Sequence, residues 1–113
     1  MSKYYDLKDV NEMAGGDEDF IKVIVQTFLE EIPPDVQSML QAIDNSNPSL
    51  AYQYAHKMKP NLQLFGLDLM EPILTIEAWS KGTETEKSAK SAGEKIDAKV
   101  NLAQHQLRND FGL

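Results

Sequence analysis

The chain has 113 residues, a length that fits one domain, and it has no cysteine, which excludes disulfides, thiolate metal sites and a thiol nucleophile. Its 11 basic and 18 acidic residues give a net charge of −7, which argues against nucleic acid as the main partner. No apolar stretch is long enough to cross a membrane and no secretion signal begins the chain, so we expect a cytoplasmic protein without a membrane partner.

The first half of the chain has the spacing of apolar residues that is typical of helices. Residues 5–14 form a short helical segment that ends at the pair of glycines following Ala14. Asp17 is placed to cap a longer helix, which Pro33-Pro34 is expected to interrupt, with Pro34 in the first turn of its continuation. The inward residues of these segments are predicted to be Phe20, Ile21, Ile24, Phe28 and Ile32, and then Val36, Met39, Leu40 and Ile43.

The next predicted helix is opened by Asn47-Pro48, a capping residue followed by proline at the first helical position. This helix is expected to run to Phe65 and to end at Gly66. Asp68 begins a capping-box pattern that predicts the start of a further helix.

The last part of the chain is more polar. Thr83 begins a second capping-box pattern, whereas the Ser/Thr-rich residues 81–95 are expected to form a loop that leads into a weakly buried helical start. The final helix has an apolar seam made of Ile96, Val100, Ala103 and Leu107. We therefore predict an all-α fold, an antiparallel four-helix bundle with an additional short N-terminal helix, as one domain over residues 1–113 and as a monomer.

Two other groups of residues are expected to be structural. Trp79 is predicted to pack in the core, and His105 to be solvated on the outer face of the last helix. Core-filling methionines are expected at Met13, Met39, Met58 and Met70.

The helix that follows Asn47 carries the candidate site. Its apolar seam is made of Ala51, Ala55, Met58, Leu62 and Phe65. His56 lies about 140° from the middle of that seam, since successive residues are about 100° apart, so it is expected to face outward. Tyr52, Lys59, Pro60 and Gln63 share its face. A neutral imidazole can attack a phosphoryl group and a nearby ammonium can stabilise the charge, although spacing alone favours an ordinary exposed surface.

Residues 55–66, Ala-His-Lys-Met-Lys-Pro-Asn-Leu-Gln-Leu-Phe-Gly, resemble the phosphorylation motif of histidine phosphotransfer (HPt) domains. The family pattern is a histidine, a lysine three residues later, a small residue next, and a glycine ten residues after the histidine. His56, Lys59 and Gly66 match this pattern. The stretch Ala-Gly-Gly-Asp at 14–17, with the phenylalanines at 20 and 28, also resembles the family, so the resemblance covers roughly residues 5–80.

The resemblance implies a role for each matching residue. His56 would accept a phosphoryl group from an aspartyl phosphate on a response-regulator receiver domain and pass it to another receiver, in a relay that begins at a hybrid histidine kinase. Lys59 would stabilise the phosphoryl charge. Gln63 is placed to hydrogen-bond the imidazole or the phosphoryl group, or to be plainly solvated. Tyr52 and Lys57 would contribute to the docking face. The alternative for Tyr52 is partial burial against a neighbouring helix, and the alternative for Lys57 is ordinary exposed surface.

The same resemblance implies that the receiver supplies Mg²⁺ and most of the catalytic groups. The chain itself has no P-loop, no glycine-rich nucleotide loop and no metal-ligand motif. We therefore expect no cofactor and no metal on this chain, and no enzymatic activity of its own.

Pro60 departs from the family, which usually has glycine at this position. Proline in a helix removes an N–H and its ring meets the carbonyl four residues earlier, that of His56, at a cost of about 3 kcal/mol, so a local kink is expected. Proline could be a compact substitute, could tilt His56 toward one partner, or could mark a degenerate, unphosphorylated adaptor that binds receivers or kinases. We favour the first two, because His56, Lys59 and Gly66 are retained.

Overall fold

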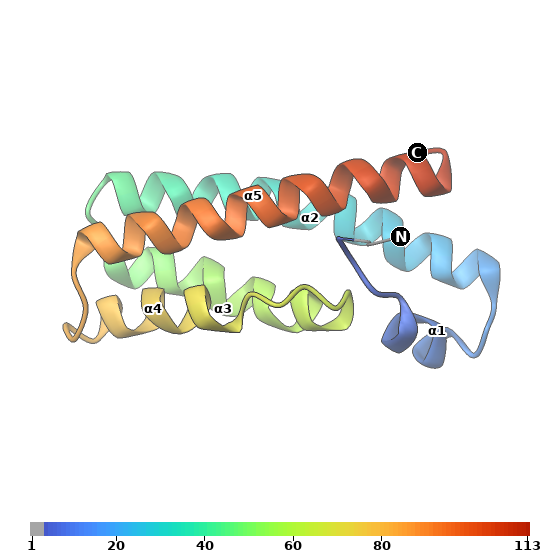
Figure 1. Ribbon diagram of the computed structural model, residues 1–113, viewed down its shortest axis with the longest axis horizontal. Helices are drawn as coiled ribbons and strands as arrows, with labels where there is room; N and C mark the ends of the chain where they lie inside the picture. Colours follow the sequence, from blue (N-terminus) through green and yellow to red (C-terminus); the bar gives the residue numbers. More distant parts are fainter. Residues whose placement is uncertain (1–3) are drawn as a thin grey trace.

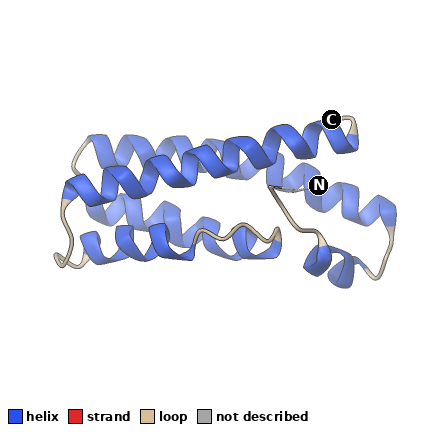
Figure 2. Ribbon diagram, viewed as in Figure 1, coloured by secondary structure: helices blue, strands red, loops and turns tan. Residues whose placement is uncertain are grey.

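The computed structural model describes residues 4–113, which form five α-helices and no β-strand, as Figure 1 and Figure 2 show. The helices are α1 (Lys8–Ala14), α2 (Glu18–Asp44), α3 (Pro48–Leu64), α4 (Met70–Ser80) and α5 (Glu86–Phe111). The prediction of an all-helical fold that begins with a short helix is confirmed for this part of the chain.

The four longer helices pack around one apolar core. α2 packs against α3 and α5, α4 packs against the same two helices, and α1 packs on α2. Figure 1 shows α1 at the end of the molecule where α2 and α5 extend beyond α3 and α4. The largest fully buried side chains are Phe28, Phe65, Ile32, Met39, Ile43, Met58, Leu62, Leu69, Ile76, Ile96, Leu107 and Val10. Among the described helices, none is long and apolar enough to cross a membrane.

α2 is one continuous helix of 27 residues, so the predicted interruption at Pro33-Pro34 is wrong. The two prolines leave the carbonyls four residues before them without their usual backbone donors. The buried stripe nevertheless continues on both sides, with Phe28 and Ile32 before the prolines and Val36 after them. Packing along α3 and α5 therefore holds both halves of α2 in helical conformation, because tertiary contacts supply most of the stability of a helix.

The starts of α2 and α3 agree with the prediction. The Asp17 side chain accepts hydrogen bonds from the backbone N–H groups of Asp19 and Phe20. The Asn47 side chain accepts one from the N–H of Leu50, with proline at the first helical position. Both caps satisfy donors that the first helical turn leaves unpaired.

The two predicted capping boxes are wrong. α4 begins after Leu69 and has no side-chain cap, so Asp68 does not cap it. α5 is capped by Thr85, whereas the Thr83 hydroxyl donates to the carbonyl of Ala78 at the end of α4. The preceding turn thus uses Thr83 to close α4, and the next threonine opens α5.

Residues 81–85 form a loop as predicted, but α5 begins at Glu86 and its first turns are well packed, which corrects the prediction of a weakly buried helical start. Ala89, Ala92 and Gly93 are buried there. A Cβ added at Gly93 would lie 2.9 Å from Cδ1 of Ile43, so α5 and α2 approach closely at this level. The residues that make this contact are small, so a pattern of large apolar residues does not reveal that this part of α5 is buried.

Two residues predicted to be inward are exposed. Phe20 is 46% exposed and Met13 is 57% exposed, whereas Ile21 and Val10 are buried. Met39, Met58 and Trp79 are buried as predicted, and Met70 is partly buried. His105 is exposed, which also agrees with its prediction.

Candidate functional site

His56 lies in the middle of the exposed face of α3. The side chains of Ala51, Ala55, Met58 and Leu62 on the opposite face are at most 1% exposed. His56 itself is exposed, as the helical spacing predicts. An imidazole in this position is accessible to a partner and is carried on a backbone that the core holds in place.

Two partly buried side chains flank the imidazole on its own helix. The ring centroids of Tyr52 and His56 are 5.6 Å apart, with 41° between the ring planes. Lys59, one turn later, is partly buried, whereas Gln63 is exposed. By helical spacing Lys59 and Gln63 lie on the same face as His56. The face thus combines a nucleophile, an aromatic surface and a cation.

Pro60 is exposed on this face and lies inside α3, which continues as a helix to Leu64. Because proline has no N–H, the carbonyl of His56 lacks the donor that an ordinary residue at this position would provide. On an exposed face, water can take the place of that donor.

Lys57, the residue after His56, points to α2 and forms an ion pair that links the two helices. Its Nζ lies 3.2 Å from Oδ1 of Asp35, and the two side chains are 62% and 12% exposed, respectively. Among the described residues, Asp35 is the buried charged residue of the core. The pair fixes α3 against α2 directly beside His56.

Asp35 is a residue of the site that was not predicted from the sequence. One signal was present, since Asp35 lies three residues after Ile32 and seven after Phe28, on the buried stripe of α2. A carboxylate in such a stripe requires a partner, because an unpaired buried charge is costly.

Gly66 is explained by the way α3 ends. Its φ of +71° lies in the left-handed region. The N–H of Gly66 donates to the carbonyl of Gln63 (3.0 Å), and the N–H of Leu67 donates to that of Leu62 (2.9 Å). These two bonds form a Schellman motif, in which glycine is the favoured residue.

The N-terminal segment also passes very close to Gly66. A Cβ at this position would lie 2.6 Å from Cβ of Asp6, and the N–H of Asp6 donates to the carbonyl of Phe65 at 2.8 Å. Gly66 lies ten residues from His56, about 15 Å along the helix axis, so it is not next to the imidazole. The structure thus accounts for this glycine without a contact to a partner.

Over residues 4–113, no group of three or more histidine, cysteine, aspartate or glutamate side chains is arranged to hold a metal ion. Comparisons with protein-family models, with curated proteins and with solved structures found no match to this chain.

Proposed function

We propose that this chain is a histidine phosphotransfer protein of a phosphorelay, built as an antiparallel four-helix bundle of the HPt type. His56 would accept a phosphoryl group from the aspartate of one response-regulator receiver domain and pass it to another. The observation that supports the proposal most strongly is the exposed imidazole in the middle of a core helix, with Lys59 one turn away on the same face.

The chemistry requires little of this chain beyond an accessible nucleophile. The unprotonated ring nitrogen of His56 attacks the phosphorus of the aspartyl phosphate, forming an N–P bond. The P–O bond to the aspartate breaks and its carboxylate leaves. The ammonium of Lys59 stabilises the negative charge on the phosphoryl oxygens, and transfer to the second receiver is the reverse reaction. The receiver would contribute Mg²⁺.

The exposed face of α3 would be the docking surface for the receiver. Tyr52 offers a partly buried aromatic ring, and aromatic side chains are enriched in the centres of interfaces. Lys59 provides positive charge on a chain of net charge −7, which suits the acidic pocket of a receiver. Pro60 and Gln63 are exposed beside the histidine and would contact the receiver loops.

The test is transfer from a purified, phosphorylated receiver domain to the wild-type chain and to the His56→Gln variant. His105→Gln is a matched control, because His105 is also exposed on a helix. We expect label on the wild type and on His105→Gln only. The label should be lost in acid and survive alkali, as a phosphoramidate does.

If receivers bind to the chain but no label reaches His56, the chain is an adaptor and the phosphotransfer proposal is wrong. A Pro60→Gly variant, tested in parallel, then shows whether the proline is responsible. Label on Pro60→Gly alone would mean that proline at this position blocks the transfer.

A further inference from the structure

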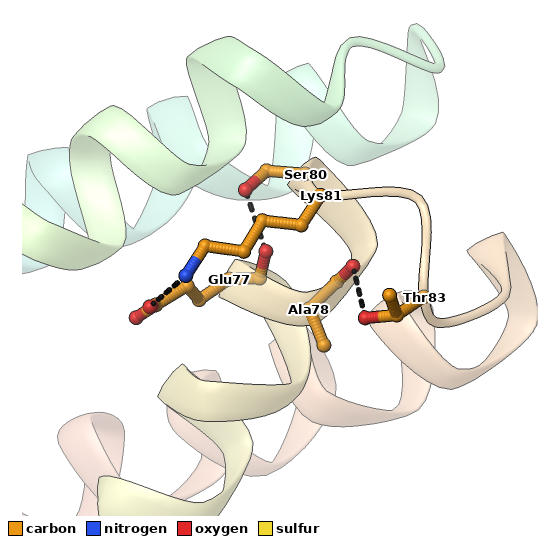
Figure 3. Close-up of polar contacts among 5 residues, drawn as sticks. All are labelled: Glu77, Ala78, Ser80, Lys81 and Thr83. Atoms are coloured by element: carbon orange, nitrogen blue, oxygen red, sulfur yellow. Dashed lines mark hydrogen bonds and ion pairs between the residues drawn. The ribbon is translucent and has the colours of Figure 1, made fainter.

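An ion pair lies at the C-terminal end of α4, the helix that packs against α3. Nζ of Lys81 is 3.0 Å from Oε1 of Glu77, and the two side chains are 65% and 26% exposed, respectively. Figure 3 shows the Lys81 side chain extending back along α4 from the end of the helix to Glu77. The carboxylate thus pairs with the ammonium across one turn at the end of α4.

The pair lies on the flank of α4 that is next to α3. The other flank, with Pro72 and Thr75, lines a groove against α5. Glu77 is about 160° from Thr75 around the helix, so it points away from that groove. Figure 3 shows the pair on the side of α4 toward the neighbouring green helix, α3, which packs against α4.

Tyr52 connects the pair to the histidine. α3 packs against α4, and Tyr52 lies one turn before His56 on the same face of α3, with the two ring centroids 5.6 Å apart. In agreement with this arrangement, the hydrogen bond and charge of Glu77 raise the pKa of Lys81, and Tyr52 adds a smaller contribution in the same direction. α3 and α4 run in opposite directions in Figure 1. Moving forward along α3 from Tyr52 to His56 therefore runs in the same direction as moving backward along α4 from Lys81 to Glu77. The ammonium of Lys81 lies at the Glu77 carboxylate.

We propose that Lys81 is a second cation for the phosphoryl group on His56, and that Glu77 holds its ammonium in place before phosphorylation. This inference rests on the proposed function. A phosphoryl group carries about two negative charges at neutral pH, against one on Glu77, so it attracts the ammonium more strongly. An ammonium has three donors and can bind both groups together. Lys81 thus adds to the cation that Lys59 provides from α3.

The experiment uses phosphoramidate, a small-molecule donor that requires no receiver, to phosphorylate the full chain. Loss of phosphohistidine is then followed by ³¹P NMR. Hydrolysis requires a proton on the departing imidazole, and a nearby cation opposes that protonation. In a water-like dielectric, removing one such nearby charge should speed hydrolysis several-fold. We expect this result for Lys81→Gln, and wild-type rates for Lys81→Arg.

Lys90→Gln is the matched control. Lys90 forms an ion pair with Glu86 at the same i,i+4 spacing on α5, with Nζ and Oε2 3.7 Å apart. Its removal should leave the rate unchanged. Equal rates for Lys81→Gln, Lys90→Gln and the wild type would overturn this inference and leave phosphotransfer intact. A wild-type chain that takes no phosphoryl group on His56 would overturn both.

Discussion

Replacing Gly66 by alanine separates a structural requirement from a role in phosphotransfer. Gly66 has a left-handed backbone, and its missing Cβ leaves room for Asp6. In Gly66→Ala the new methyl group would lie 2.6 Å from the Asp6 Cβ, so the N-terminal segment must move away from the end of α3.

The expected loss of stability has two parts. A left-handed conformation costs an alanine about 1–2 kcal/mol. Displacing the segment also breaks the hydrogen bond from Asp6 to the carbonyl of Phe65, which contributes about 0.5–1.5 kcal/mol. The free energy of unfolding of Gly66→Ala should therefore fall by about 1.5–3.5 kcal/mol.

Gly82→Ala provides the comparison. Gly82 has a φ of +79° but no atom within 4 Å of an added Cβ, so only the backbone cost of about 1–2 kcal/mol applies. Urea unfolding followed by circular dichroism measures both variants. If Gly66→Ala is no less stable than Gly82→Ala, the close approach of Asp6 is not what requires glycine. We also expect Gly66→Ala to accept phosphate normally where it is folded.

Three further substitutions test other features. Ser46→Gly should raise the free energy of unfolding by about 0.5–1 kcal/mol in urea titrations, because Ser46 has a φ of +53° at the end of α2. Lys57→Ala should lower it by about 1–2 kcal/mol by leaving Asp35 unpaired, and Asp35→Asn should remove most of that loss in a double-mutant cycle. Burial and the hydrogen bond to Asp110 raise the pKa of Tyr5, so its stabilising effect is present below pH about 10 and lost above it. Tyr5→Phe should therefore weaken the alkaline loss of stability.

The periodicity of apolar residues was enough to predict the all-helical fold and the outward position of His56. Both depend on the angle of about 100° between successive helical residues, which is a local property. The caps at Asp17 and Asn47 were predictable for the same reason, because a cap needs only the residues that follow it.

The features that were missed depend on neighbours distant in sequence. The cost of Pro33-Pro34 is local, but the packing that keeps α2 continuous comes from α3 and α5. The pairing of Lys57 with Asp35 spans 22 residues, and the approach of Asp6 to Gly66 spans 60 residues of the chain. Only the folded arrangement of the helices brings these groups together.

Reconstitution of a two-receiver relay is the most direct test of the central claim. A phosphorylated first receiver and an unphosphorylated second receiver are mixed with catalytic amounts of the wild-type chain or of His56→Gln. We expect label to move to the second receiver only with the wild-type chain, passing through a transient, acid-labile species on His56. Movement of label at the same rate with His56→Gln, or no movement with the wild type while both receivers bind it, would contradict the account.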